Sequence, residues 1–361
     1  MGIEYWLFQL KSRAISPAHT MKILAIETSC DETSVAVIAE GVVLANIVSS
    51  QIKLHAEYGG VVPELATREH LRNLLPVSEQ ALNLAGVAIA NIDAIAATQG
   101  PGLPSALLVG LYAAESLAFV LDKPFVPINH HEAHLYSAWV TGNPLRAEFS
   151  EFQPSVSLIV SGGHTLLVLV EAELRHRVLG GTIDDAAGEC FDKVAKLIGL
   201  PYPGGPELDR LAQFGNPRAY AFPRPMIFDS SDDFSFSGLK TAVRYFLRDH
   251  PEVFESRAAI QDLCASVQAA IVEVLVKKTV RVALRTGVKC VTASGGVMCN
   301  SALRSQLNAA CASEGLSLRI AERGLCTDNA AMVGILAERK LLKKNGERRY
   351  DFEIAPGLAL V

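Results

Sequence analysis

The order of strand-like and helix-like segments constrains this fold most, because the same order occurs twice along the chain. In the first half, three apolar runs with strand character are followed by a segment with helical spacing. Strand, helix, strand and helix patterns then alternate. The expected segments are Ile23–Glu27, Val35–Ala39, Val42–Val48, Pro63–Ala85, Ile92–Thr98, an apolar helix within 105–121, Phe125–Asn129 and a helix from His131.

The second half repeats this order after a polar stretch at Asn143–Pro154. Three strand-like runs again precede a helix, and further strands and helices complete the unit. The expected segments are Val156–Val160, Thr165–Val170, a strand around Val178, Ala187–Leu197, a long helix from Ile260, Val288–Thr292, a helix from Asn300, Leu316–Ile320 and a helix from Asp328.

Two such units in tandem are typical of the α/β fold of actin, Hsp70 and sugar kinases (the ASKHA fold). There, two ribonuclease-H-like lobes enclose a nucleotide cleft. We expect an N-terminal lobe at 21–150 and a C-terminal lobe at 151–346. The second lobe carries an insertion at about 201–255 that is rich in Pro, Gly, Ser and Asp. Residues 347–361 form a C-terminal tail.

Composition and charge exclude several classes of protein. Hydrophobic residues make up 50% and charged residues 20%, which is ordinary globular usage and excludes a disordered or fibrous chain. A net charge of −5 excludes a free-standing, nonspecific nucleic-acid-binding protein, so any such contact needs a local patch or a partner. The seven cysteines include no C-x-x-C pair. This argues against a zinc ribbon or disulfide framework and favours reduced thiols in the cytoplasm.

The first twenty residues differ from the remainder of the chain. They include Lys11 and Arg13 and lack the cleavage pattern of a signal peptide. Since the strand pattern begins abruptly at Met21, we interpret residues 1–20 as an extension outside the fold, with a weak targeting signal as the alternative. The longest apolar run, 105–121, contains Glu115 and falls short of the about 20 residues that span a bilayer. We expect a buried helix and no membrane association.

Two matched glycine turns follow strands of the second unit. Ser161-Gly162-Gly163 follows one strand, and Ser294-Gly295-Gly296 follows another. Each turn alone is typical of a hairpin. Together they occupy corresponding strand ends, where glycine lets backbone N–H groups approach an anion and a helix N-terminus favours negative charge. The pair therefore predicts ligand contact.

Carboxylates crowd the first hairpin, Glu27–Thr33. Local hydrogen bonds of a turn explain its Ser, Thr and Asp residues. Three carboxylates between positions 27 and 32, including Asp31 and Glu32, exceed what a turn needs. We expect this turn to face the cleft.

The histidine pair His130 and His134 opens a helix directly after a strand. Helical positions four apart lie on one face, which is the spacing that two imidazoles need to bind one metal ion. A third ligand is usually a carboxylate from a distant loop, and Asp328 at the start of the final helix is a candidate.

Counting excludes one alternative for this segment. The zinc-peptidase pattern H-E-x-x-H would take His131 and Glu132 and require histidine at position 135, which is Leu135. The other histidines are interpreted as core or surface residues: His55, His70, His164, His176 and His250.

Ten motifs, spread over residues 21–346, together resemble the family of tRNA threonylcarbamoyladenosine transferases (TsaD). They are Ile26–Thr33, Tyr58–Glu64, Gly100–Leu103, the His130/His134 pair, Val160–Thr165, Asp184–Glu189, Phe191–Lys193, Tyr202–Pro206, Phe234–Thr241 and Cys326–Asn329.

The resemblance implies an enzyme that transfers the threonylcarbamoyl group of threonylcarbamoyl-AMP to N6 of adenosine 37 in tRNAs reading ANN codons, with release of AMP. It implies that His130, His134 and Asp328 hold one divalent metal ion, Fe²⁺ or alternatively Zn²⁺. Asp31 and Glu32 are candidates for the catalytic base. The implied substrate-binding residues are Ile159, Val160, Ser161, Gly162, Gly163, Asp192, Gly205, Asp209 and Asn300.

The resemblance also implies partners in the cytoplasm. These are a metal-less paralogue (TsaB-like), a small P-loop ATPase (TsaE-like) and a synthase that supplies the adenylate (TsaC-like). The chain departs from the family pattern at Ala133 and Ala330, where glycine is common, and at Asn129, where histidine is common. Each departure lies beside a metal ligand, so it bears on metal preference more than on metal binding.

Three alternatives remain open at this point. A metallopeptidase conflicts with the histidine spacing, an actin-like kinase or ATPase would not need the histidine pair, and a noncatalytic paralogue would lack the metal ligands. For tRNA, basic side chains are candidate phosphate contacts, although a charge run near a terminus is more often solvated surface. They are Lys240, Lys340, Lys343, Lys344, Arg348 and Arg349.

Overall fold

The computed structural model describes residues 20–343, 346 and 348–360. The extension expected at 1–20 therefore lies outside the described residues except for Thr20. The first sheet begins as an antiparallel meander of β1 (Lys22–Glu27), β2 (Glu32–Ala39) and β3 (Val42–Ser50). Strands β4 (Ala94–Gly100) and β5 (Phe125–Asn129) then join β1 in parallel.

Helices cover this sheet on the side away from the second lobe. Short α1 (Ile52–Ala56) precedes α2 (Pro63–Ala85), and α3 (Pro104–Val120) follows β4. Both long helices start with proline, whose missing N–H costs nothing in the first turn. They cover apolar residues of β1, β2 and β4 such as Leu24, Val37 and Ile95. Helix α4 (His130–Ser137) follows β5 without a loop.

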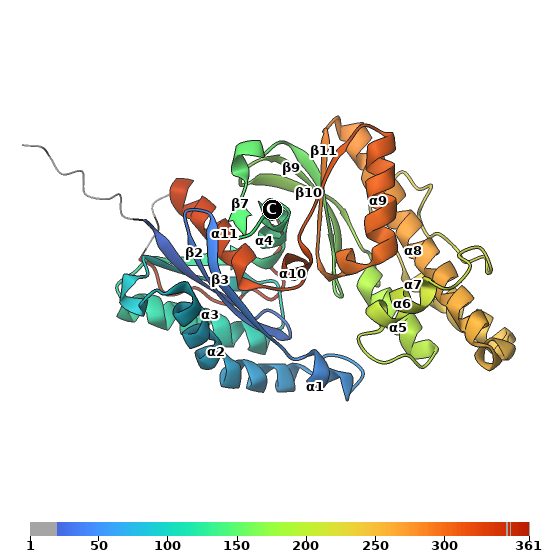
Figure 1. The fold of residues 1–361 in the computed structure, drawn as a ribbon, viewed down its shortest axis with the longest axis horizontal. Helices are drawn as coiled ribbons and strands as arrows, with labels where there is room; N and C mark the ends of the chain where they lie inside the picture. The colour runs from blue at the N-terminus through green and yellow to red at the C-terminus, as the bar shows by residue number, and fades with distance from the viewer. Residues whose placement is uncertain (1–19, 344–345, 347, 361) are drawn as a thin grey trace, which may run out of the picture.

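The second sheet repeats the pattern. Strands β8 (Ser155–Val160), β9 (Thr165–Ala172) and β10 (Arg175–Gly181) form an antiparallel meander, and β11 (Cys290–Ser294) and β12 (Ser317–Ile320) add in parallel. The strand order β10-β9-β8-β11-β12 matches the order β3-β2-β1-β4-β5 of the first sheet. The duplicated ASKHA fold expected from the sequence is therefore confirmed. The two sheets lie in the two halves of the molecule (Figure 1).

The first sheet contains two more strands than the sequence pattern predicts. The polar stretch between the lobes contains short strands β6 (Val140–Thr141) and β7 (Arg146–Ala147), and β7 pairs with β3. The segments η1 (Ile89–Asn91) and η2 (Phe149–Glu151) are single 3₁₀ turns.

The second lobe is built around α8 (Arg257–Thr286), which is largely buried. Helix α5 (Ala187–Leu197) follows the meander. Helix α9 (Ser301–Ser313) comes between β11 and β12 in the sequence. The insertion at 201–255, in which the sequence indicated no regular element, contains α6 (Gly204–Ala212), α7 (Ser237–Asp249) and η3 (Pro251–Glu255). Their apolar faces, including Leu208, Leu239 and Val243, join the core of this lobe.

Among the described residues, α8 is the one helix long and apolar enough to cross a membrane, and 67% of its most apolar window is buried inside the protein. The expected buried helix at 105–121 is α3.

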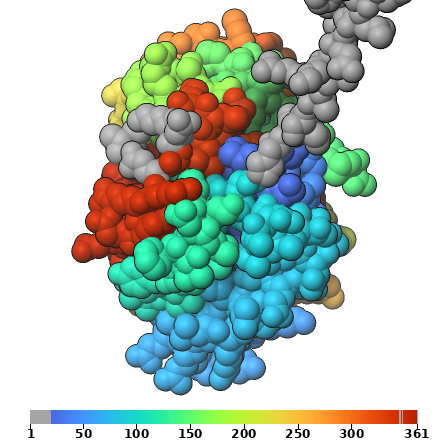
Figure 2. Space-filling model, turned by 90° about the vertical axis from the view of Figure 1, so that its left-hand side faces the viewer, coloured from blue at the N-terminus to red at the C-terminus, as the bar shows by residue number. Residues whose placement is uncertain are grey.

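The end of the chain returns to the first lobe. Helix α11 (Ala330–Lys343) falls within the range expected for the second lobe, but its residues pack on β1, β2 and α4. The tail continues along the same lobe, where Ala355 N donates to Gln99 O at 2.9 Å. The C-terminal residues, coloured red, accordingly lie beside teal residues of the first lobe in Figure 2.

Candidate metal centre between the two lobes

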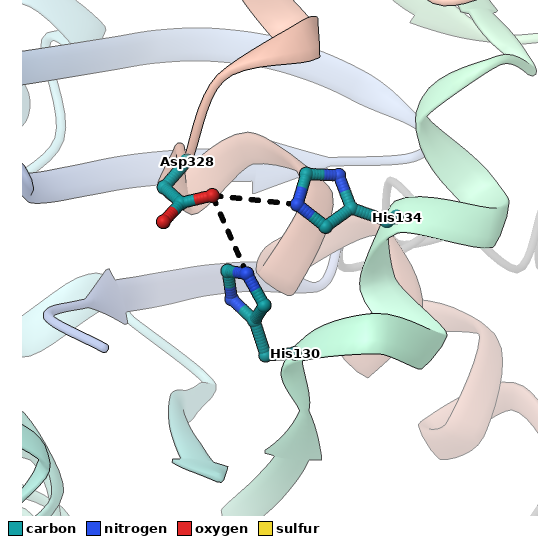
Figure 3. A group of neighbouring side chains, drawn as sticks. All are labelled: His130, His134 and Asp328. Carbon is teal, nitrogen blue, oxygen red and sulfur yellow. Dashed lines mark hydrogen bonds and ion pairs between the residues drawn. The ribbon is translucent and has the colours of Figure 1, made fainter. Parts of the chain in front are cut away.

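Three buried or half-buried side chains converge from two distant parts of the chain (Figure 3). His130 and His134 come from α4, and Asp328 comes from the loop between α10 (Arg323–Cys326) and α11. Asp328 Oδ1 lies 3.3 Å from His130 Nε2 and 3.4 Å from His134 Nε2. The three potential ligand atoms lie within 4.8 Å of one another. This donor set and spacing fit one divalent cation.

Asn129 determines where α4 begins. Its Oδ1 accepts hydrogen bonds from the N–H groups of His131 and Glu132, at 2.9 and 3.1 Å, so it caps the helix. Its Nδ2 donates to Ala359 O at 3.0 Å, which joins the helix start to the C-terminal tail. Asn129, one of the three positions where the sequence departs from the family pattern, therefore has a structural role in this chain.

Glu27 contacts the His130 ring at Nδ1, the nitrogen that does not face Asp328. Its Oε2 lies 3.1 Å from His130 Nδ1 and accepts a hydrogen bond from Thr98 Oγ1 at 2.6 Å. Ser29 Oγ lies 3.2 Å from the same ring nitrogen. A carboxylate on one imidazole nitrogen orients the other nitrogen toward a metal, as in many metal sites. The sequence analysis noted Glu27 only as part of a crowded turn, because this role depends on a strand-to-helix contact.

The charges of the cluster favour a cation. Burial alone would lower the pKa of His130, but Asp328 and Glu27 outweigh it and raise that pKa well above its usual range. Burial likewise opposes ionisation of Asp328, yet His130 and His134 hold the pKa of its carboxyl well below its ordinary value. Without a metal, the cluster therefore keeps a proton between two carboxylates. A divalent ion would supply positive charge in place of this proton, so the residues fit such an ion.

The first hairpin lies beside this cluster, as expected. Asp31 and Glu32 are 9% and 8% exposed. Burial, then the charges of Asp31 and Asp328, raise the pKa of Glu32 well above its ordinary value. Ser50 Oγ donates to Glu32 Oε1 at 3.2 Å. Glu32 thus binds a proton more tightly than a solvent-exposed carboxylate does.

The first glycine turn, Ser161–Gly163, connects β8 to β9 and lies close to the metal-ligand helix. His164 in this turn contacts His131 of α4, with ring centroids 4.0 Å apart. A side chain added at Gly162 or Gly163 would meet no atom within 4 Å, so space beside the turn is open. Ile159 and Val160 are buried within β8. Among the candidate substrate residues of this stretch, the turn is therefore the part that a ligand can reach.

The second glycine turn, Ser294-Gly295-Gly296, packs against β8, the first strand of the second sheet. Gly295 has φ +95°, and a Cβ there would lie 2.3 Å from Val160 O, so only glycine fits. The structure thus brings together the two turns that the sequence analysis paired. Asn300 follows, and its Oδ1 accepts from Leu303 N to cap α9 while its Nδ2 donates to Gln268 Oε1 at 2.8 Å.

The two candidate aspartates already have protein partners. Asp192 Oδ1 accepts from the N–H groups of Gly204 and Gly205 at 2.8 and 3.0 Å and so holds the start of α6. Asp209 accepts from Ser301 N and Ser301 Oγ at 3.1 and 2.7 Å. Asp192 thus lies with Gly205, and Asp209 lies beside Asn300, while Gly205 and Asp209 belong to the same helix, α6.

The His131–His164 contact was not predicted from the sequence, because His164 was interpreted as an ordinary core or surface histidine. Burial, then the neighbouring histidines, lower the pKa of His131 to about 2, and burial and His130 lower that of His164 to about 4. Both rings are therefore neutral at pH 7. The position of His164 directly after a glycine turn was the available signal.

Glu132 does not face the metal ligands. Its Oε2 pairs with Lys340 Nζ at 2.7 Å, and Leu135 is buried in the core between the lobes. A zinc peptidase of the H-E-x-x-H type would use this glutamate as its base. The structure therefore agrees with the sequence count in disfavouring that activity.

The basic residues proposed as phosphate contacts have partners within the protein. Lys240 pairs with Asp185 at 3.3 Å, Lys343 donates to Glu173 O at 2.7 Å and Arg348 pairs with Asp122 at 3.0 Å. Arg349 pairs with Asp351, and Lys344 lies outside the described residues. The ion pairs of Arg348 and Arg349 are exposed and therefore weak, so both interpretations of the run near the C-terminus stay open.

Comparison with known proteins identifies the family. Residues 42–335 match the family model of tRNA N6-adenosine threonylcarbamoyltransferase (TsaD). The enzyme of that name from Geotalea uraniireducens is 51% identical over 93% of this chain and 96% of its own length. The one from Moorella thermoacetica is 49% identical over 90% of this chain and 93% of its own length.

Solved structures show the fold. Full-length HypF, in its phosphate- and nucleotide-bound form, gives a TM-score of 0.60 at 15% identity over 90% of this chain and 47% of that chain. The ROK hexokinase from Thermus thermophilus gives 0.50 at 16% identity over 90% of this chain and 100% of that chain. At these identities the likeness concerns the fold alone.

Fold and site together define an ASKHA-fold protein with a candidate His–His–Asp metal centre between its lobes. The chain belongs to the tRNA N6-adenosine threonylcarbamoyltransferase (TsaD) family. It is an enzyme, a transferase that modifies tRNA.

Proposed function

We propose that this enzyme transfers the threonylcarbamoyl group from threonylcarbamoyl-AMP to N6 of adenosine 37 in tRNAs that read ANN codons and releases AMP. One observation carries the proposal. The His130/His134/Asp328 cluster lies beside the open Ser161–Gly163 turn, linked to it by the His131–His164 contact. A ligand that occupies the turn therefore reaches the ligands of the metal.

We further propose that His130, His134 and Asp328 hold one Fe²⁺ or Zn²⁺ ion. A bound ion of this kind supplies Lewis acidity and a fixed anchor for carbonyl or phosphate oxygens. Glu27 keeps the His130 ring oriented through Nδ1, and the fully buried Thr98–Glu27 hydrogen bond keeps Glu27 in place. This support fixes the direction in which the ligand atoms point.

The adenylate occupies the second lobe in this proposal. The N–H groups and open space of Gly162 and Gly163, together with the Ser161 hydroxyl, receive its phosphate, next to buried Ile159 and Val160. Asp192 has one oxygen on the N–H groups of Gly204 and Gly205, which leaves its second oxygen for a ribose hydroxyl. The Asp209–Ser301 hydrogen bonds and the Asn300 cap hold the adjoining wall rigid.

In the transfer step, N6 of the adenosine attacks the carbamoyl carbon and the bond from that carbon to the phosphate oxygen of AMP breaks. The attacking nitrogen must lose one proton. Asp31 and Glu32 are the proposed acceptors, since both are buried beside Asp328. The raised pKa of Glu32 makes it, once ionised, a stronger base than an ordinary glutamate.

We place the enzyme in the cytoplasm with the TsaB-like, TsaE-like and TsaC-like partners. An exposed apolar face on α2 and α3 suits the metal-less paralogue. Thr67 Oγ1 donates to Ser105 Oγ at 2.7 Å, so the two helices start side by side. The next two turns of each helix carry large exposed apolar side chains on this face: Leu71, Leu75, Leu108 and Tyr112.

The decisive experiment is reconstituted transfer. The purified enzyme is combined with partners, synthase, threonine, bicarbonate, ATP and an unmodified ANN-reading tRNA. Nucleosides from the digested tRNA are then analysed by mass spectrometry. We expect threonylcarbamoyladenosine, and its absence beside an active control enzyme would refute the proposal. A tRNA with guanosine at position 37 should remain unmodified.

The metal assignment has its own test. His130→Ala should lose bound metal by elemental analysis and lose transfer, whereas His250→Ala, at an exposed histidine paired with Glu252, should lose neither. Cleavage of a glycoprotein by the metal-loaded wild type, absent in His130→Ala, would instead support a peptidase.

A further inference from the structure

Two cysteines from distant parts of the sequence meet beside the candidate site. Cys299 ends η4 (Gly296–Cys299), one residue before Asn300, and Cys326 ends α10, two residues before Asp328. Their side chains lie close enough to interact. Cys326 is fully buried, whereas Cys299 is partly exposed. A small molecule in solvent can therefore reach Cys299. Cys326 can react with it only by way of Cys299.

The backbone around both sulfurs is held together by Arg304. Its Nε donates to Met298 O at 2.6 Å, and its Nη2 donates to Ala321 O at 2.7 Å and lies 3.3 Å from Cys326 Sγ. A side-chain atom added at Gly296 would touch the Thr327 methyl group at 3.9 Å. The segments that carry the two cysteines thus pack directly on each other. This packing keeps the two sulfurs near each other, which disulfide formation requires.

The surroundings also make Cys299 the more reactive sulfur. The Cys326 thiol, with help from the guanidinium groups of Arg304 and Arg323, lowers the pKa of Cys299 despite its partial burial. Thiolates are the nucleophilic form of cysteine. The chain offers a natural comparison in Cys290 and Cys311, which are both buried and whose pKa values are raised by burial.

We propose that Cys299 and Cys326 form an oxidant-sensitive pair that closes to a disulfide when the protein meets a peroxide. The Cys299 thiolate attacks one peroxide oxygen, the O–O bond breaks, and the departing hydroxide takes up a proton to leave as water. The Cys326 sulfur then attacks the resulting Cys299 sulfenic acid, and the S–O bond breaks with loss of a second water. The two thiols supply the two electrons that reduce the peroxide.

The bond would connect the turn that carries Asn300 to the loop that carries Asp328. These segments lie on the proposed substrate side and the proposed metal side of the site. A covalent link between them restricts any relative movement that substrate entry or product release requires. Oxidation should therefore inhibit transfer, and thiol reduction should restore it.

The test is peptide mapping of the full-length protein. Reduced protein is exposed to hydrogen peroxide, quenched with catalase, alkylated, digested without reductant and analysed by mass spectrometry. We expect a linked peptide containing Cys299 and Cys326, with loss of two alkylatable thiols that dithiothreitol restores. Cys299→Ala should abolish the linked peptide, and Cys290→Ala should leave it unchanged. In Cys326→Ser, Cys299 should proceed to sulfinic acid, which dithiothreitol does not reverse.

Cys299 oxidised in the wild type without a link to Cys326 would overturn the proposal, as would a link formed by Cys290 and Cys311 instead. Transfer activity gives the second readout, since inhibition by peroxide should be reversible in the wild type and absent in Cys299→Ala. The linked peptide remains measurable even if the proposed transfer fails, so the two proposals can be refuted separately.

Discussion

At the scale of single residues, Glu27 shows how a candidate metal site depends on side chains that are not themselves metal ligands. It is fully buried, and its two oxygens accept from Thr98 Oγ1 and Ser29 N while contacting His130 Nδ1. The His130/His134 spacing was predictable because it is a local helical pattern. The part played by Glu27 was not, since it depends on β1 and β4 lying side by side under the start of α4.

Replacement of this carboxylate should weaken metal binding without removing a ligand. Glu27→Gln keeps the shape of the side chain but removes the charge that orients the His130 ring. We expect metal affinity to fall by about 10–100-fold, the usual effect of losing such a partner. Competition with a chromogenic zinc chelator measures the change. Glu64→Gln, at an exposed residue in the first turn of α2, is the control. Equal affinities for Glu27→Gln and wild type would contradict this role.

At the scale of secondary-structure elements, close contact between α11 and the first sheet depends on Gly334. A Cβ at this position would lie 2.4 Å from Ile38 Cγ1 and 3.1 Å from Ala25 Cβ. The sequence predicted the helix, but its neighbours are nearly 300 residues away, so periodicity could not show which sheet it covers. The two helices of the 201–255 insertion were missed for a different reason, because their Pro- and Gly-rich flanks are typical of loops.

Gly334→Ala should destabilise the protein even though alanine favours helices. Overpacking in a core costs about 1–3 kcal/mol, which exceeds the ~1 kcal/mol that alanine gains over glycine in a helix. Chemical denaturation measures the free energy of unfolding. Gly324→Ala is the matched control, since a Cβ there meets no atom within 4 Å. A stabilised Gly334→Ala protein would show that α11 does not lie this close to the sheet.

The start of α7 provides a pH-dependent element. Asp184 accepts hydrogen bonds from Phe236 N at 2.9 Å and from the Ser235 and Ser237 hydroxyls at 2.6 Å each. Burial would raise the pKa of Asp184, but these bonds lower it below the ordinary 3.8. Because the folded-state pKa is depressed, this stabilisation is complete above the unfolded pKa. It is lost as pH falls through the folded value.

Asp184→Asn should therefore lower the unfolding free energy at pH 7, by less than about 1 kcal/mol because solvent screens this exposed carboxylate. The difference from wild type should shrink as pH falls from about 4 toward 3. Thermal unfolding across this range measures both effects. Asp249→Asn, an exposed change at the opposite end of α7, should leave stability nearly unchanged. A difference that stays constant from pH 7 to pH 3 would rule out the charged form of Asp184 as its source.

At the scale of the whole molecule, the C-terminal tail packs on the first lobe and connects several of its elements. Tyr350 Oη donates to Lys123 O at 2.9 Å, Phe352 N donates to Glu115 Oε1 at 2.8 Å, and the Phe352 ring lies 5.6 Å from that of Phe125. The duplicated topology could be predicted, because each unit carries its own periodic pattern. The return of the chain end could not, since the tail has no periodicity and its contacts lie on strands and helices far away in sequence.

Phe352→Ala should lower the free energy of unfolding by about 2 kcal/mol, because a half-buried aromatic side chain loses part of its buried area. Phe228→Ala is a strict comparison, since Phe228 is 91% exposed and its loss should cost less than about 0.5 kcal/mol. Denaturant titration of both variants gives the two values. Equal stabilities would mean that the tail contributes nothing to the first lobe.

The packing of α11 also determines when during synthesis the first lobe can be finished. Ile23, Ala25 and Ile38 leave the ribosome early, yet Val333, Leu336 and their neighbours on α11 cover them. At about 5–20 residues per second, the intervening 300 or so residues take on the order of 15–60 s to translate. Throughout that interval the nascent sheet presents an uncovered apolar face, a natural target for a chaperone. Chains that terminate before Asp328 lack both this cover and one of the three candidate metal ligands.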